Sequence, residues 1–349
     1  MPDPLSKRSL MKFAATTSFV VSLGFCLALG STIFAGQRQG RSTGAPKSRT
    51  FRLDYGASLS ELPPNARVRV WLPVPQSNDH QKITVVKTQL PTAGQTAIEP
   101  TYGNKILYFE TADPPSGRLA FKVSYLVHRH EIRALKGETG QTKLTDEQRN
   151  LFLAAQKRVP LTGKPFDLLN GVTFSSDPLT LARTLYDRVD DHVRYDKSRP
   201  GYGHGDVLWV CDSRFGNCTD FHSLFISWAR AKGLPTRFEI GFPLPPQRGA
   251  GNIGGYHCWA LFYSAEKGWV PVDISEADKH PQLKDYFFGN LTEDRVGFTT
   301  GRDIDLIPRQ DGDPLNYFVH PYVEVNGRAW SREKLELDLA YTDIKTPLP

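Results

Sequence analysis

Beyond its first fifty residues, the sequence lacks the positive charge that a phosphate backbone would attract. The whole chain has a formal charge of +6, but residues 1–50 hold seven Lys or Arg and a single acid, whereas residues 51–349 hold 36 bases and 36 acids. Nucleic-acid binding depends on Lys and Arg concentrated on a folded domain. The composition therefore predicts that nucleic acid is not a partner.

Dense acidic loops and internal repeats are missing as well. The acidic residues are scattered along the chain, and no segment has the spacing of an EF-hand loop. We therefore expect no activation by calcium, and more generally no metal and no cofactor. At about 150 residues per domain, a chain of 349 residues predicts two domains behind a leader.

Cysteine is scarce. The chain has four, and one of them, Cys26, belongs to an apolar run near the N-terminus, which leaves Cys211, Cys218 and Cys258. In an oxidising compartment, an odd number leaves at least one thiol without a partner in the chain, and such a thiol is a candidate for chemistry. A disulfide between Cys211 and Cys258 is one possibility, and it would leave Cys218 free.

The N-terminus has the organisation of an export signal. A basic region ends at Lys12, and residues 13–35 form an uncharged, largely apolar run. Residues 6–12 resemble the twin-arginine export consensus with Lys in place of the first Arg. We expect residues 1–36 to be an export signal, or an anchor if uncleaved, since the run is long enough to span a bilayer. The expected location is periplasmic or extracellular, with membrane contact only through this segment.

After a polar linker at residues 37–49, the sequence pattern changes to short runs of β-forming residues bounded by Gly, Pro or Asn. Several runs alternate apolar and polar residues, which is typical of antiparallel strands with one buried face. We interpret residues 50–130 as a small N-terminal β-sandwich domain. The predicted strands lie at residues 50–55, 67–72, 82–87, 105–110 and 119–127.

Residues 131–349 mix helical and β-type patterns and are interpreted as a second, α+β domain. Apolar residues recur at three and four positions in three segments, each a predicted helix. Three β-type runs follow the last of them. The helices are predicted at 145–158, 178–192 and 219–232, and the strands at 237–242, 257–263 and 269–275.

Cys218 directly precedes the last predicted helix. The partial positive charge of the first-turn N–H groups would stabilise its thiolate. A nucleophile of this kind needs a base and a carboxylate that orients the base. If Tyr263 pairs with Trp269 in a hairpin, then His257 and Asp273 project from the same face within side-chain reach, whereas a turn one residue shorter would place them on opposite faces.

Four motifs in fixed order carry a resemblance to a known family. They are Gly-Asn-Cys-Thr-Asp-Phe-His-Ser-Leu-Phe (216–225), Ala-Arg-Ala-Lys-Gly-Leu-Pro-Thr-Arg (229–237), Tyr-His-Cys-Trp (256–259) and Gly-Trp-Val-Pro-Val-Asp (268–273). This order resembles the transglutaminase-like superfamily in its bacterial exported branch. The resemblance implies a papain-like core at about residues 175–300, in which the helix bearing the cysteine packs on an antiparallel sheet.

The same resemblance implies roles for three residues: Cys218 as nucleophile, His257 as general base and Asp273 as the carboxylate that orients His257. The chemistry would be acyl transfer from an amide through a thioester. We favour hydrolysis of peptide or isopeptide bonds over transfer to an amine, which would crosslink proteins. The expected partner is a peptide or protein substrate, with a cell-wall peptide as one candidate. The Cys218 N–H would bind the oxyanion, with Trp209 or residues 211–213 as a second donor.

Other interpretations remain open at this point. Cys218 would be an ordinary buried thiol if the motifs were accidental, or the cleft would hold a peptide without catalysis. A zinc site is disfavoured because the Cys211-Cys218-His222 spacing is unusual and adjacent His257 and Cys258 point to opposite faces of a strand. His222 is expected to support the site. His204 and Asp206 lie on a glycine-rich loop and are either substrate contacts or solvated, and Trp209 and Tyr256 are expected cleft walls.

Overall fold

The computed structural model describes residues 45–136 and 143–345. The predicted export signal and most of the predicted linker lie outside these residues. Within the part of the chain that is described, no helix is long and apolar enough to cross a membrane.

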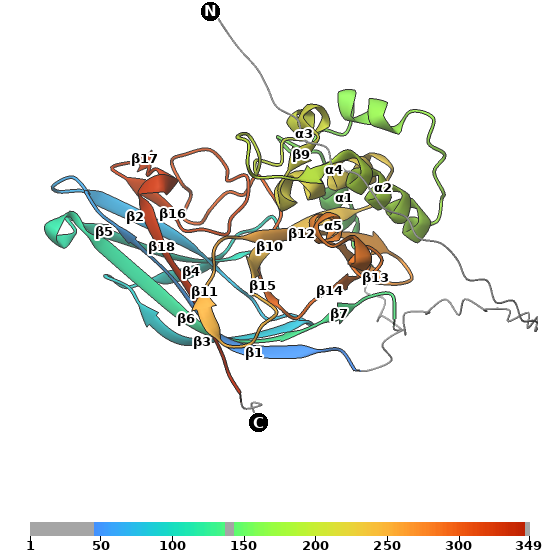
Figure 1. Cartoon of the computed structure of the whole chain (residues 1–349). Helices are drawn as coiled ribbons and strands as arrows, with labels where there is room; N and C mark the ends of the chain where they lie inside the picture. The colour runs from blue at the N-terminus through green and yellow to red at the C-terminus, as the bar shows by residue number, and fades with distance from the viewer. Residues whose placement is uncertain (1–44, 137–142, 346–349) are drawn as a thin grey trace, which may run out of the picture. The chain divides into compact units, whose positions relative to one another are not determined.

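Two five-stranded antiparallel sheets make up the β-sandwich (Figure 1). All five predicted strands of residues 50–130 are present, and each is longer than expected at one or both ends. Their inward side chains form the core between the sheets. The first sheet has the order β11 (Ala250–Asn252), β18 (Leu335–Asp343), β1 (Ser48–Leu59), β6 (Leu119–His130) and β3 (Gln81–Gln89). The second has the order β17 (Arg328–Ala329), β16 (Tyr322–Val325), β2 (Arg67–Val74), β5 (Lys105–Ala112) and β4 (Gln95–Ile98).

Strands from the C-terminal end of the chain complete both sheets. β18 pairs with β1 from Leu59↔Leu335 to Phe51↔Asp343, and β16 pairs with β2. The predicted domain boundary at residue 130 stays a prediction, but the sandwich itself does not end there. Pairing between segments almost 300 residues apart leaves no local pattern in the sequence, because each strand shows only its own alternation.

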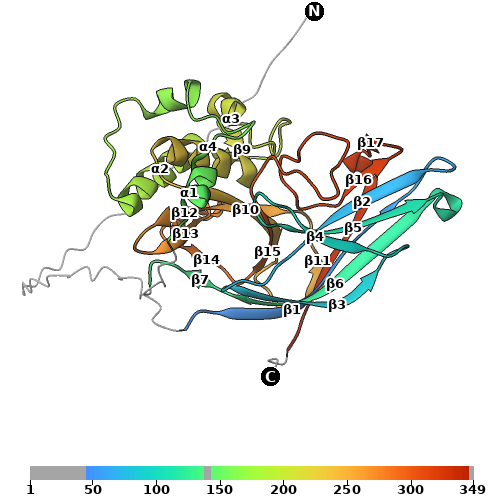
Figure 2. The same ribbon diagram turned by 180° about the vertical axis from the view of Figure 1, so that it is seen from behind.

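A third antiparallel sheet positions the candidate site. Its order is β13 (Gly268–Val272), β12 (His257–Ser264), β10 (Thr236–Pro243) and β15 (Arg295–Thr300). Helices lie on one side of this sheet and the sheet of β1 and β6 lies on the other, in both views (Figures 1 and 2). The helices are α1 (Asp146–Leu153), α2 (Pro178–His192), α3 (Val207–Ser213), α4 (Cys218–Ala231) and α5 (Ile274–Lys279). The fold is α+β, as predicted.

Short elements connect these layers. The paired segments β7 (Ile132–Arg133) and β14 (Asn290–Leu291) form one two-stranded sheet, and β8 (Arg194–Tyr195) and β9 (Phe215–Gly216) form another. Four 3-10 turns are present in the described residues, at Pro115–Gly117, Lys164–Leu169, Pro281–Leu283 and Arg332–Lys334.

Helix boundaries follow from capping residues. The predicted helix 178–192 coincides with α2, because Asp177 accepts a hydrogen bond from the Thr180 N–H and Pro178 occupies the first turn. The predicted helix 145–158 is too long: the capping box of Thr145 and Gln148 starts α1, which ends at Leu153. The predicted strand 269–275 is also too long, and β13 ends at Val272.

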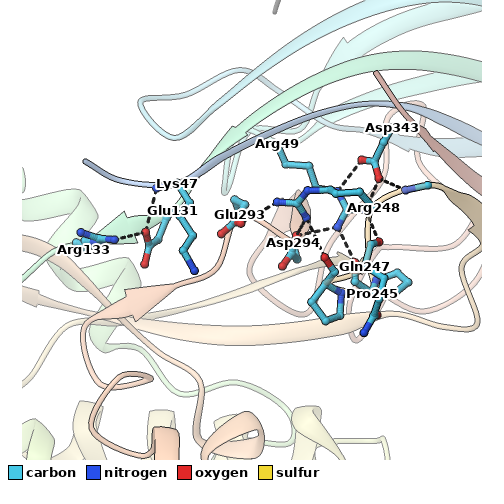
Figure 3. Close-up of polar contacts among 12 residues, drawn as sticks. Lys47, Arg49, Glu131, Arg133, Pro245, Gln247, Arg248, Glu293, Asp294 and Asp343 are labelled. Atoms are coloured by element: carbon cyan, nitrogen blue, oxygen red, sulfur yellow. Dashed lines mark hydrogen bonds and ion pairs between the residues drawn. The ribbon is translucent and has the colours of Figure 1, made fainter. Parts of the chain in front are cut away.

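A buried arginine links the first strand to distant parts of the chain (Figure 3). Arg49, at the start of β1, donates from Nε to Asp343 Oδ1 at 2.7 Å and from Nη1 to Asp294 Oδ1 at 2.7 Å. Arg248 contacts Asp294 as well, and it also pairs with Glu293. These contacts fix the end of β18 and the segment that enters β15 against β1.

Replacing Arg49 by alanine is expected to destabilise the protein by about 3–5 kcal/mol, since it leaves the largely buried carboxylate of Asp343 without its cation, while Asp294 keeps Arg248. The Arg49 side chain is 1% exposed. Arg67→Ala is the control: Arg67 also pairs with a carboxylate, Glu110, but its side chain is 63% exposed, so little change is expected. Thermal and denaturant unfolding measure both. Equal midpoints for the two variants would contradict the assigned role of Arg49.

Candidate active site

Cys218 is the first residue of α4, one residue earlier than predicted, and its side chain is buried. The helix begins there because Asn217 and Asp220 form a capping box. The Asn217 side chain accepts from the Thr219 N–H at 2.9 Å, and the Asp220 carboxylate accepts from the Asn217 N–H at 2.9 Å. The Cys218 sulfur therefore lies at the positive end of the helix dipole, as the sequence indicated.

Asp220 also holds the glycine-rich loop against the start of α4. Its carboxylate accepts hydrogen bonds from the N–H groups of Gly203 at 2.7 Å and Gly205 at 2.9 Å. Gly205 has a φ of +56°, and a Cβ there would collide with the Ser223 hydroxyl. Glycine is required at this position because the loop backbone approaches α4 closely.

The β12–β13 hairpin has the register on which the sequence argument depended. Tyr263 pairs with Trp269, and Ala260 pairs with Val272. Asp273 follows directly and caps α5. His257 Nε2 lies 2.8 Å from Asp273 Oδ2. The prediction that the hairpin brings these two side chains within reach is confirmed.

Asp273 is held from several sides and is fully buried. Besides His257, its Oδ2 accepts from Arg295 Nη1 at 2.9 Å. Its Oδ1 accepts from the Ser275 hydroxyl at 3.2 Å and from the Glu276 N–H at 3.2 Å. A carboxylate with this many donors has a fixed orientation, and it fixes the ring of His257 in turn.

The surroundings favour a charged pair of thiolate and imidazolium. Burial alone would raise the pKa of the Cys218 thiol, but hydrogen bonds from Cys258 and His257 and the nearby positive charge lower it well below its ordinary value. Burial would lower the pKa of His257, but the charge and hydrogen bond of Asp273, together with Cys218, raise it to about 10. Because Nε2 of His257 is bound to Asp273, Nδ1 is the nitrogen left for the sulfur.

Asp273 is ionised for a related reason. Burial would raise the pKa of its carboxyl, but the charges of His257 and Arg295 hold it far below its ordinary value. The three side chains therefore form a line of alternating charge, from thiolate to imidazolium to carboxylate.

His222 is a buried neighbour of the three catalytic candidates and contacts Cys258 and the start of α5. Burial lowers its pKa to about 4, so the ring is neutral. Its Nε2 accepts a hydrogen bond from the Ile274 N–H at 3.0 Å, which places the ring proton on Nδ1, 3.7 Å from the sulfur of Cys258. Burial raises the pKa of Cys258 well above its ordinary value, so it remains a thiol and can donate to Cys218. Consecutive His257 and Cys258 thus both contact the Cys218 sulfur, although they start from opposite faces of β12.

The three described cysteines are all free and buried. The disulfide between Cys211 and Cys258 that the sequence allowed is not formed, since Cys258 lies at the Cys218 sulfur whereas Cys211 lies on α3. Burial raises the pKa of Cys211 to about 11. Within the described residues, no group of three or more His, Cys, Asp or Glu side chains is arranged to hold a metal ion.

Tyr256, the residue before β12, contacts the first residues of α4 with its side chain. Its hydroxyl accepts from Asn217 Nδ2 at 3.0 Å and lies 3.1 Å from the Thr219 hydroxyl. Its ring contacts Tyr317, whose hydroxyl donates to the Gly203 carbonyl at 3.1 Å. These two tyrosines join the glycine-rich loop to the helix start.

Other residues named from the sequence have structural contacts. Asp206 caps α3 by accepting from the N–H groups of that helix. The His204 side chain is exposed, while its carbonyl accepts from Arg302 and Asn316. The Trp209 ring packs on Phe215 and lies against Gly201. A second oxyanion donor from Trp209 or residues 211–213 stays a prediction.

Sequence reasoning missed Arg295, Asp220 and the contact between Cys258 and Cys218. The spacing of Asn217 and Asp220 just before an apolar run is a capping-box signal, so Asp220 could have been found. Arg295 had no such signal, because it reaches Asp273 from a strand on the far side of β10. The Cys258 contact depends on where β12 begins, which the sequence does not specify.

Comparisons with known proteins agree with this arrangement. Residues 168–274, which contain Cys218, His257 and Asp273, match the family model described as the transglutaminase-like superfamily. A Haemophilus influenzae protein of uncharacterized function is 29% identical over 303 residues, covering 75% of this chain and 81% of that protein. YebA of Bacillus subtilis, also uncharacterized, is 22% identical over 148 residues, which are 40% of this chain and only 17% of YebA.

A solved structure shows the same fold. It is a Cytophaga hutchinsonii protein described as "a Putative Cysteine Protease", with a TM-score of 0.56 at 15% identity, covering 87% of this chain and 93% of that chain. The chain therefore has a papain-like, transglutaminase-like core. Its residues 168–274 carry the core domain of the transglutaminase-like superfamily.

Proposed function

We propose that the protein is an exported, cysteine-dependent acyl-transfer enzyme that hydrolyses peptide or isopeptide bonds. The observation that carries the proposal is the line from Cys218 through His257 to Asp273, in which the pKa of the thiol is lowered and that of the imidazole is raised. Perturbed pKa values of this kind are typical of catalytic groups. The basic, apolar leader supports export to the periplasm or beyond.

The reaction would proceed in two steps. The Cys218 thiolate attacks the amide carbonyl carbon, and the C–N bond of the resulting tetrahedral intermediate breaks as the His257 imidazolium gives its Nδ1 proton to the departing amine. A thioester on Cys218 remains. Neutral His257 then takes a proton from water, the hydroxide attacks the thioester, and the C–S bond breaks to restore the thiolate and release the acid.

Asp273 would keep the Nε2 proton of His257 in place through both steps, so that Nδ1 alone exchanges protons with the substrate. The N–H of Cys218 is one donor to the oxyanion, since the first N–H groups of a helix have no acceptor within the helix. Cys258 would hold the resting thiolate by donating its S–H.

The substrate class follows from the family resemblance: a peptide or protein, with a cell-wall peptide as one candidate. The test is mass spectrometry of a library of peptides and peptidoglycan fragments incubated with wild type, with Cys218→Ala as the blank. Products that have gained one water support the proposal. Condensed products formed with loss of ammonia would assign amine transfer instead. No covalent change with any substrate, despite binding, would leave a non-catalytic binding module and overturn the proposal.

A further inference from the structure

A small polar cavity of about 100 Å³ lies between β3, β6, β10 and β15. It is on the face of the third sheet that is turned away from α4, and Cys218, His257 and Asp273 are not among its lining residues. Its lining is rich in amides, hydroxyls and charges: Gln76, Asn78, Gln81, Tyr102, Asn104, Arg129, Glu239 and residues 297–300.

The unusual member of this lining is Arg129, from β6. The residue is 3% exposed. Arg129 Nη1 donates a long hydrogen bond to Gln81 Oε1, at 3.3 Å. The Arg129 Nε has no hydrogen-bond partner among the described residues. No carboxylate of the described residues lies within ion-pairing distance of it, whereas buried charges are normally paired. Burial lowers the pKa of Arg129 only to about 10, so it remains a cation at neutral pH.

The surrounding charges do not balance Arg129. Arg237 pairs with Glu239 at 2.7 Å, and Arg295 pairs with Asp273 at 2.9 Å. Both of these arginines also have an Nε without a partner. Three guanidinium groups thus share two carboxylates, and Asp273 additionally serves His257. Among the described residues, one positive charge in this layer therefore has no counter-ion.

We propose that this cavity binds a small carboxylate, held by the Arg129 guanidinium. A guanidinium presents its donors in a planar fork that matches the two oxygens of a carboxylate. The cavity is too small for more than a compact group. Glu239 on its wall would repel a doubly charged phosphate more strongly than a single carboxylate charge. The exposed Asn78 marks the rim through which the ligand enters.

The occupant would lie close to the catalytic line without touching it. Trp259 donates from Nε1 to Glu239 at 2.9 Å, and the Arg295 guanidinium lies over the Trp259 ring, 4.9 Å from its centroid. Arg295 in turn donates to Asp273. The binding proposal is independent of the reaction proposed above, and it can be tested on protein whose Cys218 is replaced.

The test is thermal unfolding of the whole protein in increasing acetate, phosphate or chloride at constant ionic strength and pH. A specific ligand raises the unfolding temperature with the logarithm of its concentration. We expect acetate to raise it by several degrees above chloride. No difference between acetate and chloride overturns the site, and stabilisation by phosphate but not by acetate overturns the carboxylate assignment.

Arg129→Met removes the charge while keeping most of the volume. We expect it to fold, because it removes an unpaired buried charge, and to lose the acetate effect. Arg129→Lys keeps the charge but not the fork, and should weaken acetate binding about tenfold. Arg118→Met, at an exposed arginine, should respond to acetate as the wild type does. An acetate effect that persists undiminished in Arg129→Met or Arg129→Lys would place the ligand elsewhere and refute the proposal.

Discussion

Replacing Cys218 by alanine is expected to lower amide turnover by at least about 10⁴-fold, because no covalent intermediate can form. The fold should survive, since α4 begins at the capping box of Asn217 and Asp220 and not at the thiol. Turnover is measured on whichever substrate the library assay identifies.

Cys211→Ala is the matched control. It removes a second buried, free thiol on α3, outside the line to Asp273. We expect it to retain activity close to that of the wild type. Substantial turnover by Cys218→Ala, or equal losses in the two variants, would show that the chemistry does not depend on Cys218.

Asp273→Asn should have the next largest effect, a loss of turnover of about 10⁴-fold, because the amide cannot keep His257 charged or in the same tautomer. The sign of the accompanying pKa changes follows from the charges. Without the carboxylate, the pKa of His257 falls from about 10, and the pKa of Cys218 rises because its cationic partner is lost. Turnover and the pH profile of thiol alkylation report the two changes separately.

The same substitution should destabilise the protein by about 3–5 kcal/mol, since the buried Arg295 guanidinium loses its carboxylate. Asp285→Asn is the control for both readouts, because Asp285 pairs with an arginine but is 87% exposed. An Asp273→Asn variant that loses stability but keeps both turnover and the alkylation profile would reduce Asp273 to a structural role.

Much of the fold could be predicted because the signals are local. Alternation located the strands of residues 50–130, and Asp177 with Pro178 located α2. The segments that complete the sandwich, β16 and β18, were not recognised. Their partners lie at the other end of the chain, and a pairing at such separation is decided by the packed sheets rather than by the segment itself.

The candidate site shows the same division. The order of motifs singled out Cys218, His257 and Asp273. The register that brings His257 and Asp273 together could be predicted because the turn between Tyr263 and Trp269 is short enough to count its residues. Arg295 and Arg129 could not be found in this way. Arg129 comes from a strand distant in sequence and reaches this neighbourhood only because two sheets stack. Arg295 lies only 22 residues from Asp273, but no local pattern shows that its strand joins the same sheet on the far side of β10.

The most direct test of the central claim is the rate of iodoacetamide alkylation of each cysteine in the folded protein as a function of pH. The thiolate and imidazolium coexist between the lowered pKa of Cys218 and the pKa of about 10 of His257. Cys218 should therefore react rapidly at pH 6, with little gain in rate up to neutral pH, while Cys211 and Cys258 remain largely unmodified. A Cys218 that reacts no faster than Cys211, or only as the pH approaches 9, would contradict the account.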